Sequence, residues 1–132
     1  MALGLRPSAG TITWWLTDKS VTDEARSLFV DPHAVQLPLA LDAFSDWINS
    51  EPVEMWGNSA AFDCGLLAAA YTACGKETPW AFWRERCYRT VKSLPGAEDV
   101  KLVRTGTHHN ALDDAKYQAL CASIYLKRLG VK

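Results

Sequence analysis

The stretch that decides the fold is Pro52-Val-Glu-Met-Trp-Gly57, which is followed at once by Asn58-Ser-Ala-Ala-Phe-Asp63. The first six residues are the best strand candidate in the chain, a short segment closed by a glycine. A helix is expected to follow from about Ala60 to Cys74, with Gly75 as its C-terminal cap. A strand that leads directly into a helix indicates an α/β fold.

Three helices are expected before this strand. Thr11-Ile-Thr-Trp-Trp-Leu16 predicts a short one. Ser20-Val-Thr-Asp23 has the spacing of a capping box, so a second helix is expected to open there and to continue to about Phe29, before Asp31-Pro32. The segment from Gln36 to Asn49 has apolar residues at helical spacing, which predicts an amphipathic helix.

A second strand is expected after the central helix. Pro79-Trp-Ala-Phe-Trp-Arg84 predicts a helical turn led by proline, and Cys87-Tyr-Arg-Thr90 predicts a short strand that runs into a further helical turn. A polar loop is expected from Pro95 to Gly106, and a final helix from about Ala111 to Leu129, stopped by Gly130. Two short strands make a poor sheet, so either further strands or a partner chain should complete it.

The composition is that of an ordinary globular protein. The chain has 132 residues, 48% of them apolar and 22% charged, and one domain over residues 1–132 is expected. A formal net charge of −1 gives no overall attraction to nucleic acid, so any polyanion site must be local. No signal peptide and no membrane span are expected. The four cysteines form no C-x-x-C motif and are expected to be reduced, in a cytoplasmic protein.

Asp63 is the first candidate for a functional role. It comes just after a strand, at the start of a helix, where open α/β sheets place functional groups. The alternative is a structural role, because a carboxylate in the first turn of a helix interacts favourably with the helix dipole. The residue type and its position fit both interpretations.

The second candidate region is Gly106-Thr-His-His109-Asn-Ala-Leu-Asp113-Asp114. Asn110 and Asp113 have the spacing of an N-cap and its reciprocal partner. Asp114 lies in the first turns of the same helix, where the dipole would keep a metal-binding carboxylate ionised. His109 precedes the cap on a loop led by a glycine, and a histidine free to move there can titrate near neutrality, as a general base requires.

Less specific interpretations of this region remain open. His109 could be an exposed loop histidine beside ordinary helix-start acids. His108 directly precedes it, and spacing alone does not decide which of the two would be the base. A zinc site built on both histidines is conceivable, although no third ligand lies at a usual spacing.

Basic residues gather between the two candidate acids. They are Arg84, Arg86, Arg89, Lys92, Lys101 and Arg104, with Trp80, Trp83 and Tyr88 among them. Cations and aromatic faces together suit a single strand of nucleic acid, and we expect Arg86, Tyr88 and Arg89 to contact it. The alternative is that the cations lie on an ordinary surface while the aromatic rings pack inward.

Several motifs, taken in order, resemble one family along nearly the whole chain. They are Thr11-Ile-Thr-Trp-Trp-Leu, Asp23-Glu-Ala-Arg26, Trp56-Gly-Asn-Ser-Ala-Ala-Phe-Asp63, Pro79-Trp-Ala-Phe-Trp-Arg, Arg86-Cys-Tyr-Arg-Thr90 and His109-Asn-Ala-Leu-Asp-Asp114-Ala. The chain resembles the ribonuclease T-like, DEDD-type 3′–5′ exonucleases with a histidine base (DEDDh), and among them the 3′–5′ exoribonuclease-like domain common in phage and prophage proteins. The most specific part is the last motif, a histidine followed five residues later by an aspartate at a helix start.

The resemblance implies a fold, a reaction and a site. The fold is ribonuclease H-like, and the reaction releases nucleoside monophosphates from the 3′ end of RNA or single-stranded DNA. Four carboxylates hold two Mg²⁺ or Mn²⁺ ions in this family, and the ions clamp the scissile phosphate. By resemblance Asp63 is the third acid, Asp114 the fourth and His109 the base, while Asn58 and Phe62 shape the pocket for the terminal nucleotide.

One part of the family pattern is missing. The family's first strand carries an Asp-x-Glu pair, and no Asp-x-Glu occurs in these 132 residues. The resemblance therefore predicts a ribonuclease H-like domain that is truncated at its N-terminus and lacks its first strands, helix-rich with a small residual sheet, in which metal binding and activity are impaired. An exposed sheet edge and apolar helix faces would favour a homodimer.

Two alternatives to an impaired enzyme follow from the same observations. The chain could be a non-catalytic nucleic-acid-binding or assembly module that uses the basic and aromatic stretch. A partner chain could also supply the absent acids and so restore a composite site.

Overall fold

The computed structural model describes residues 4, 6–48, 52–97 and 102–131. Contacts between Cα atoms group the chain into two compact units. Unit 1 contains Met1–Leu5 and Val35–Thr90, and unit 2 contains Arg6–Ala34 and Val91–Lys132. The expectation of a single domain stays a prediction. Within the described residues, no helix has the length and apolarity needed to cross a bilayer.

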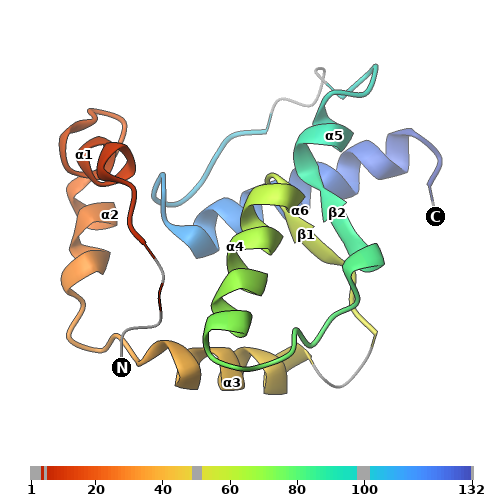
Figure 1. The fold of residues 1–132 in the computed structure, drawn as a ribbon. Helices are drawn as coiled ribbons and strands as arrows, with labels where there is room; N and C mark the ends of the chain where they lie inside the picture. The colour runs from red at the N-terminus through yellow and green to blue at the C-terminus, as the bar shows by residue number, and fades with distance from the viewer. Residues whose placement is uncertain (1–3, 5, 49–51, 98–101, 132) are drawn as a thin grey trace. The chain divides into compact units, whose positions relative to one another are not determined.

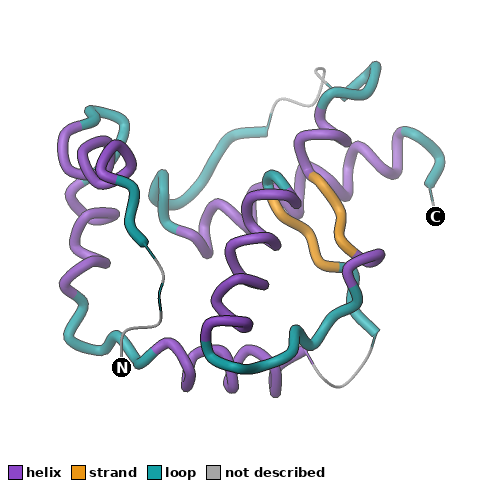
Figure 2. Tube along the Cα trace, in the orientation of Figure 1, coloured by secondary structure: helices purple, strands orange, loops and turns teal. Residues whose placement is uncertain are grey.

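Unit 1 is built on a two-stranded parallel sheet. Strand β1 (Met55–Gly57) pairs with β2 (Glu85–Cys87), and Trp56 lies opposite Arg86 in the register. Helix α4 (Ala60–Ala73) follows β1 and packs on both strands, as Figures 1 and 2 show. Parallel strands need such a crossover connection. The helix-rich α/β architecture with a small sheet, expected from the sequence, is therefore confirmed.

The core of unit 1 lies between α4 and α3 (Leu37–Ile48), which pack against each other. Its buried residues are Leu41, Ile48, Ala70, Tyr71 and Trp80. The hydroxyl of Tyr71 donates a hydrogen bond to the carbonyl oxygen of Leu41 (2.9 Å) and lies 2.8 Å from Oγ of Ser45. The core thus joins the two helices by apolar packing and by one buried polar contact.

Helix α4 ends as its sequence predicts. Gly75 has a φ of +67°, a left-handed conformation that glycine adopts without strain. Its N–H donates to the carbonyl of Thr72, and the N–H of Lys76 donates to that of Tyr71. This pair of bonds is a Schellman motif, which satisfies the carbonyl groups left free at the helix end.

Unit 2 contains helices from both ends of the chain. The elements are α1 (Ala9–Thr17), α2 (Asp23–Ser27), the 3₁₀ turn η1 (Leu28–Val30) and α6 (Ala111–Arg128). Helix α5 (Tyr88–Lys92) spans the junction between the two units. Gly130, with a φ of +72°, closes α6 by the same kind of motif as that at the end of α4. The expected final helix and its glycine stop are confirmed.

Arg26 fastens α2 to the end of α1. Its Nε donates to the carbonyl oxygen of Trp15 (3.1 Å) and its Nη2 to that of Asp18 (2.8 Å). Nη1 also pairs with the carboxylate of Asp23 at 2.9 Å. A guanidinium at a helix C-terminus satisfies free carbonyl groups and complements the negative end of the dipole. These bonds connect α2 to the C-terminal end of α1.

The expected cap of the second helix is wrong by two residues. Oγ1 of Thr22 accepts the N–H of Ala25 at 3.2 Å, so Thr22 is the N-cap. Ser20 instead donates its N–H and its hydroxyl to the carboxylate of Asp18. The α-helix ends at Ser27, before the expected end near Phe29, because the last residues form the 3₁₀ turn η1.

The second strand also lies earlier than expected. The residues that pair with β1 are Glu85–Cys87, and Tyr88 already begins α5, so the strand expected at Cys87–Thr90 is wrong. The preceding turn is the 3₁₀ turn η2 (Phe82–Arg84) and does not begin at Pro79. Pairing with β1 decides this boundary, since Glu-Arg-Cys carries little strand signal of its own.

Two expected segments extend beyond the described residues. Asn49, the expected end of α3, lies outside them, as do residues 98–101 of the loop expected between Pro95 and Gly106. The strand expected from Pro52 is confirmed only from Met55 onwards. The rest of the expected α3 helix is present, with Pro38 in its first turn.

Candidate functional site

Asp63 lies in the first turn of α4, just beyond the carboxyl end of β1. Its Oδ2 accepts the backbone N–H of Ser59, the N-cap residue, at 2.8 Å. A Cβ on Gly57 would lie only 2.9 Å from the Cβ of Asp63, so this close approach needs a glycine. The side chains of Asp63 and the neighbouring Phe62 are exposed. Asp63 therefore does stabilise the helix start, and its metal-binding role stays a prediction.

The backbone of Asn58 connects the ends of the two strands. Its carbonyl oxygen accepts the N–H of Arg89 (3.1 Å) and the thiol of Cys87 (3.8 Å). Hydrogen bonds to the Cys87 sulfur, from the Thr90 hydroxyl above all and also from the N–H of Ala60, lower the pKa of this thiol to about 7. Sequence reasoning did not single out Cys87, because a lone cysteine at the end of a short strand carries no distinguishing motif.

The basic and aromatic stretch is divided between the core and the surface. Trp80 is buried, and Tyr88 is only 6% exposed, so neither ring offers a free face for a base. Arg84 and Arg86 lie at the surface and share the carboxylate of Glu54, at 3.5 and 2.6 Å. The inward-packing alternative thus holds for two of the three aromatic residues considered in this stretch. The substrate contacts expected of Arg86, Arg89 and Tyr88 stay predictions.

The loop before α6 is held by its own hydrogen bonds. Oδ1 of Asn110 accepts the N–H groups of Leu112 and Asp113 at 3.1 and 3.2 Å, which confirms Asn110 as the N-cap. Oδ2 of Asp113 accepts the N–H of Thr107 at 2.8 Å. Asp113 is therefore not the reciprocal partner of Asn110, because its carboxylate accepts the N–H of Thr107, three residues before Asn110, and not the N–H of Asn110 itself.

Gly106 makes this arrangement possible, and its replacement by alanine should disrupt it. Gly106 has a φ of +86°, and a Cβ would lie 2.5 Å from Cγ of Asp113. Backbone strain and overlap together should lower the free energy of unfolding by about 2–4 kcal/mol, as measured by urea denaturation. Gly96→Ala is the matched control, since Gly96 has the same φ of +86° with open space around it. Equal losses in the two variants would contradict the proposed overlap with Asp113.

His109 is the candidate base and has an unusual backbone. Its φ is +63°, and it is the sole non-glycine residue with a positive φ in the part of the chain described. Its ring packs edge to face against Trp14 and Trp15, at centroid distances of 5.1 and 5.9 Å. His108 is exposed. The expectation that His109 is free to move is wrong, because two indoles of α1 hold its ring.

Asp114 already has a cationic partner. Its carboxylate forms an ion pair with the guanidinium of Arg104, which also lies over the ring of Tyr117, 5.2 Å from the centroid. Nε of Arg104 is buried and, among the described residues, has no hydrogen-bond partner. The sequence contained Arg104 in its basic stretch but gave no sign of this pairing across the loop. Lys101, of the same stretch, lies outside the described residues.

The described residues do not form a complete metal site. Among them, no group of three or more His, Cys, Asp or Glu side chains could hold a metal ion. Asp114 is paired with Arg104, and Asp63 accepts the N–H of Ser59. Asp63 belongs to unit 1, whereas His109 and Asp114 belong to unit 2. Convergence of the three side chains on a shared cation stays a prediction.

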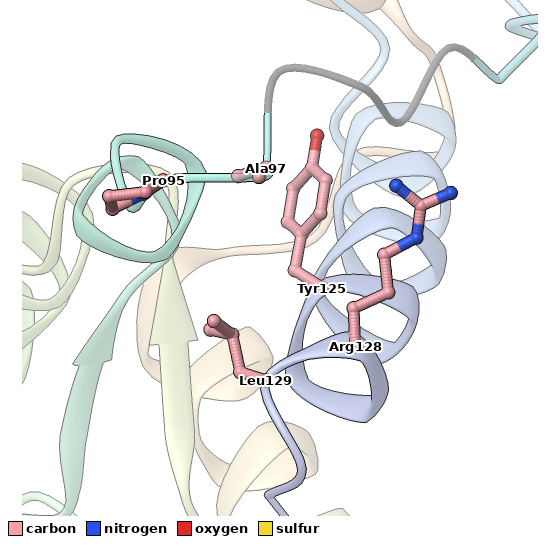
Figure 3. A pocket seen from close by; sticks show the side chains of 6 residues that line it. Pro95, Ala97, Tyr125, Arg128 and Leu129 are labelled. Carbon is pink, nitrogen blue, oxygen red and sulfur yellow. The ribbon is translucent and has the colours of Figure 1, made fainter.

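Unit 2 also contains a cavity of about 230 Å³. Its lining residues are Pro95, Gly96, Ala97, Tyr125, Arg128 and Leu129. Figure 3 shows the ring of Tyr125 rising from α6 towards Ala97. None of the candidate residues lines this cavity, so it is separate from the loop that carries His109.

Comparison with known families identifies the class of the protein. Residues 1–126 match the family model described as the 3′-5′ exoribonuclease Rv2179c-like domain. The chain belongs to this family of exoribonuclease domains. A 3′–5′ exonuclease-type function and a nucleic-acid substrate follow at the level of the family. No curated protein matches the chain, and no solved structure matches it.

Proposed function

We propose that this chain is a DEDD-type 3′–5′ exonuclease domain of ribonuclease H-like fold, which removes nucleoside monophosphates from the 3′ ends of RNA or single-stranded DNA. The main support for this proposal is that residues 1–126 match the exoribonuclease family. The strained, tryptophan-packed His109 at the start of α6 supports it, because backbone strain in folded proteins concentrates at functional sites. The proposed compartment is the cytoplasm, which suits four free thiols.

His109 is the proposed general base. Its imidazole would take a proton from the water that attacks the terminal phosphodiester, and histidine suits this step because its pKa is ordinarily near neutrality. The edge contacts with Trp14 and Trp15 fix the direction of the ring. A fixed ring lowers the entropic cost of reaching the reactive geometry.

Asp63 and Asp114 are the proposed ligands of Mg²⁺ or Mn²⁺. Bound ions would stabilise negative charge on the scissile phosphate. An ion at Asp114 would have to compete with Arg104, and the sequence contains no Asp-x-Glu pair to supply further carboxylates. We therefore expect these 132 residues to bind metal weakly and to turn over slowly.

The substrate contacts follow from positions in unit 1. Asn58 lies at the carboxyl end of β1 and the exposed Phe62 lies beside Asp63, so both are proposed to shape the pocket for the terminal nucleotide. Arg86 and Arg89 are proposed to contact phosphates. A contact by the Tyr88 ring would require its uncovering, since the residue is buried.

A non-catalytic nucleic-acid-binding module is the second candidate. It is favoured by the Arg104–Asp114 ion pair, which neutralises the carboxylate without a metal. A homodimer is proposed in either case, because the described residues form a sheet of two strands and leave many large apolar side chains exposed, and both features favour association. A second copy could also contribute carboxylates to a composite site.

A single preparation tests these proposals. Its mass is first measured under native conditions, and a 5′-labelled single-stranded oligonucleotide is then incubated with excess protein and Mn²⁺. Slow shortening from the 3′ end is expected in the wild type and in Asp46→Asn, an exposed control carboxylate on α3, and is expected to be lost in Asp114→Asn.

Three outcomes would change the proposals. Rapid turnover would contradict impaired activity. Salt-dependent binding without any shortening would favour the non-catalytic module. A monomer at all concentrations would end the homodimer proposal.

A further inference from the structure

Two large aromatic side chains of unit 1 lie side by side at the surface. Phe82 and Trp83, in the 3₁₀ turn η2, are 77% and 67% exposed. Their ring centroids are 5.1 Å apart, and the rings are nearly perpendicular, with an interplanar angle of 84°. Trp80, in the same stretch, packs on Tyr71 in the core. Trp80 therefore belongs to the core, whereas Trp83 faces solvent together with Phe82.

The backbone and one guanidinium hold this turn in place. The N–H of Arg84 donates to the carbonyl of Ala81 at 2.9 Å, which closes the turn. Nη1 of Arg86 donates to the carbonyl oxygens of Trp83 (2.9 Å) and Glu85 (3.0 Å). The positive charge of Arg86 is thus fixed against the peptide that carries the exposed indole.

Two guanidinium groups follow the two rings in the chain. Arg84 and Arg86 share the carboxylate of Glu54, at 3.5 and 2.6 Å, and Glu85, between them in sequence, is a second anion whose Oε1 accepts the Nε1–H of Trp80 at 3.0 Å. Arg89, in α5 beyond the carboxyl end of β2, is exposed and adds a further cation. Exposed aromatic faces beside fixed cations suit a single-stranded nucleic acid, whose bases stack while its phosphates need positive charge. An apolar protein surface would gain nothing from these cations.

The position of the turn η2 indicates which part of a bound nucleic-acid strand the two rings would contact. Phe82 and Trp83 precede the amino end of β2, whereas Asn58 and Asp63 lie beyond the carboxyl ends of the strands. The three residues of β2 separate the two places by about 10 Å. If the 3′ nucleotide of a nucleic-acid strand lies near Asp63, the bases that reach Phe82 and Trp83 are therefore further from its 3′ end.

We infer that Phe82 and Trp83 form a stacking platform for the bases of a single-stranded substrate upstream of its 3′ end, with Arg86 fixed beside them to meet the phosphates. This inference rests on the proposed function, because it uses the position of the terminal nucleotide near Asp63. The platform explains why two apolar side chains remain exposed in a turn that is otherwise well fastened. It also predicts that affinity depends on the length of the substrate.

The test compares the double variant Phe82→Ala/Trp83→Ala with Trp47→Ala. Trp47, on α3 of the same unit, is 75% exposed and serves as the matched control. Fluorescence anisotropy with a 5′-labelled single-stranded RNA 12-mer in EDTA measures affinity without cleavage. The double variant is expected to bind about tenfold more weakly than the wild type, and Trp47→Ala to bind like the wild type.

Two further substrates separate stacking from charge. A 12-mer whose upstream nucleotides lack bases should bind equally to the wild type and to the double variant, because the platform has nothing to stack on. A dinucleotide should also bind equally to both, because it does not reach the turn. Raising the salt concentration should weaken both proteins alike and leave the ratio of their affinities for the intact 12-mer unchanged.

Defined results would overturn the inference. The platform is wrong if the double variant binds the intact 12-mer as the wild type does, or if it loses equal affinity for the base-free strand. A variant that changes oligomeric mass and keeps its RNA affinity would assign the two rings to a protein interface. The proposed function fails in a different way, namely when the wild type shortens no oligonucleotide in Mn²⁺.

Discussion

Tyr71→Ala is expected to lower the free energy of unfolding by about 3–5 kcal/mol, the usual cost of truncating a large aromatic residue in a core. Tyr71 is 1% exposed, and its ring packs against Trp80 at a centroid distance of 5.8 Å. The substitution would leave a cavity between α3 and α4 and would remove the hydroxyl that bonds to Leu41. Urea denaturation monitored by circular dichroism measures the change.

Two control variants separate the contribution of the buried Tyr71 ring from that of its hydroxyl and from that of an exposed side chain. Tyr71→Phe keeps the ring and removes only the hydroxyl, and should cost about 1 kcal/mol because the carbonyl of Leu41 retains the hydroxyl of Ser45 as a donor. Leu39→Ala removes an exposed apolar side chain of α3 and should cost less than about 0.5 kcal/mol. A loss in Tyr71→Ala no larger than that in Leu39→Ala would show that this core does not stabilise unit 1.

His109→Asn is expected to slow the residual removal of 3′ nucleotides by about 100- to 10,000-fold, the contribution typical of a general base. Asparagine tolerates the left-handed conformation that residue 109 adopts, so the backbone of the loop should be kept. The amide cannot accept a proton from water near neutral pH. The measurement is the single-turnover rate of shortening of a 5′-labelled oligonucleotide with Mn²⁺ present.

His108→Asn is the matched control for this variant. His108 is adjacent in sequence, carries the same side chain and is exposed, and its ring lies 5.5 Å from that of His109. It should retain the wild-type rate. A rate that falls in His108→Asn and not in His109→Asn would exchange the roles of the two histidines. Unchanged rates in both would remove the base from this loop altogether.

Helices with strong local signals could be predicted from the sequence. The apolar spacing between Gln36 and Asn49 predicted α3, and the glycines that follow α4 and α6 predicted their ends, because a C-terminal glycine acts within a single turn. The cap of α2 was misplaced because Ser20 and Thr22 both carry a hydroxyl near acids. The choice between them depends on Asp18, which binds Ser20.

The candidate site could be predicted only in part, since its geometry depends on contacts distant in sequence. The spacing within the His109 motif showed that an N-cap lies beside two acids, and the N-cap is confirmed. It could not show that Asp113 binds Thr107, because that bond requires the conformation of Gly106. The Arg104–Asp114 pair and the burial of Tyr88 likewise follow from tertiary packing, for which local spacing gives no signal.

The contact between α1 and the His109 loop has a consequence for synthesis of the protein. Trp14 and Trp15 are synthesised before His109, which packs against them and lies 94 residues after Trp15 (109 − 15). At usual translation speeds, roughly 5–20 s pass between the synthesis of the two tryptophans and that of His109. Their exposed faces are available to chaperones during this delay, and the loop that carries the candidate base can pack against them only after it.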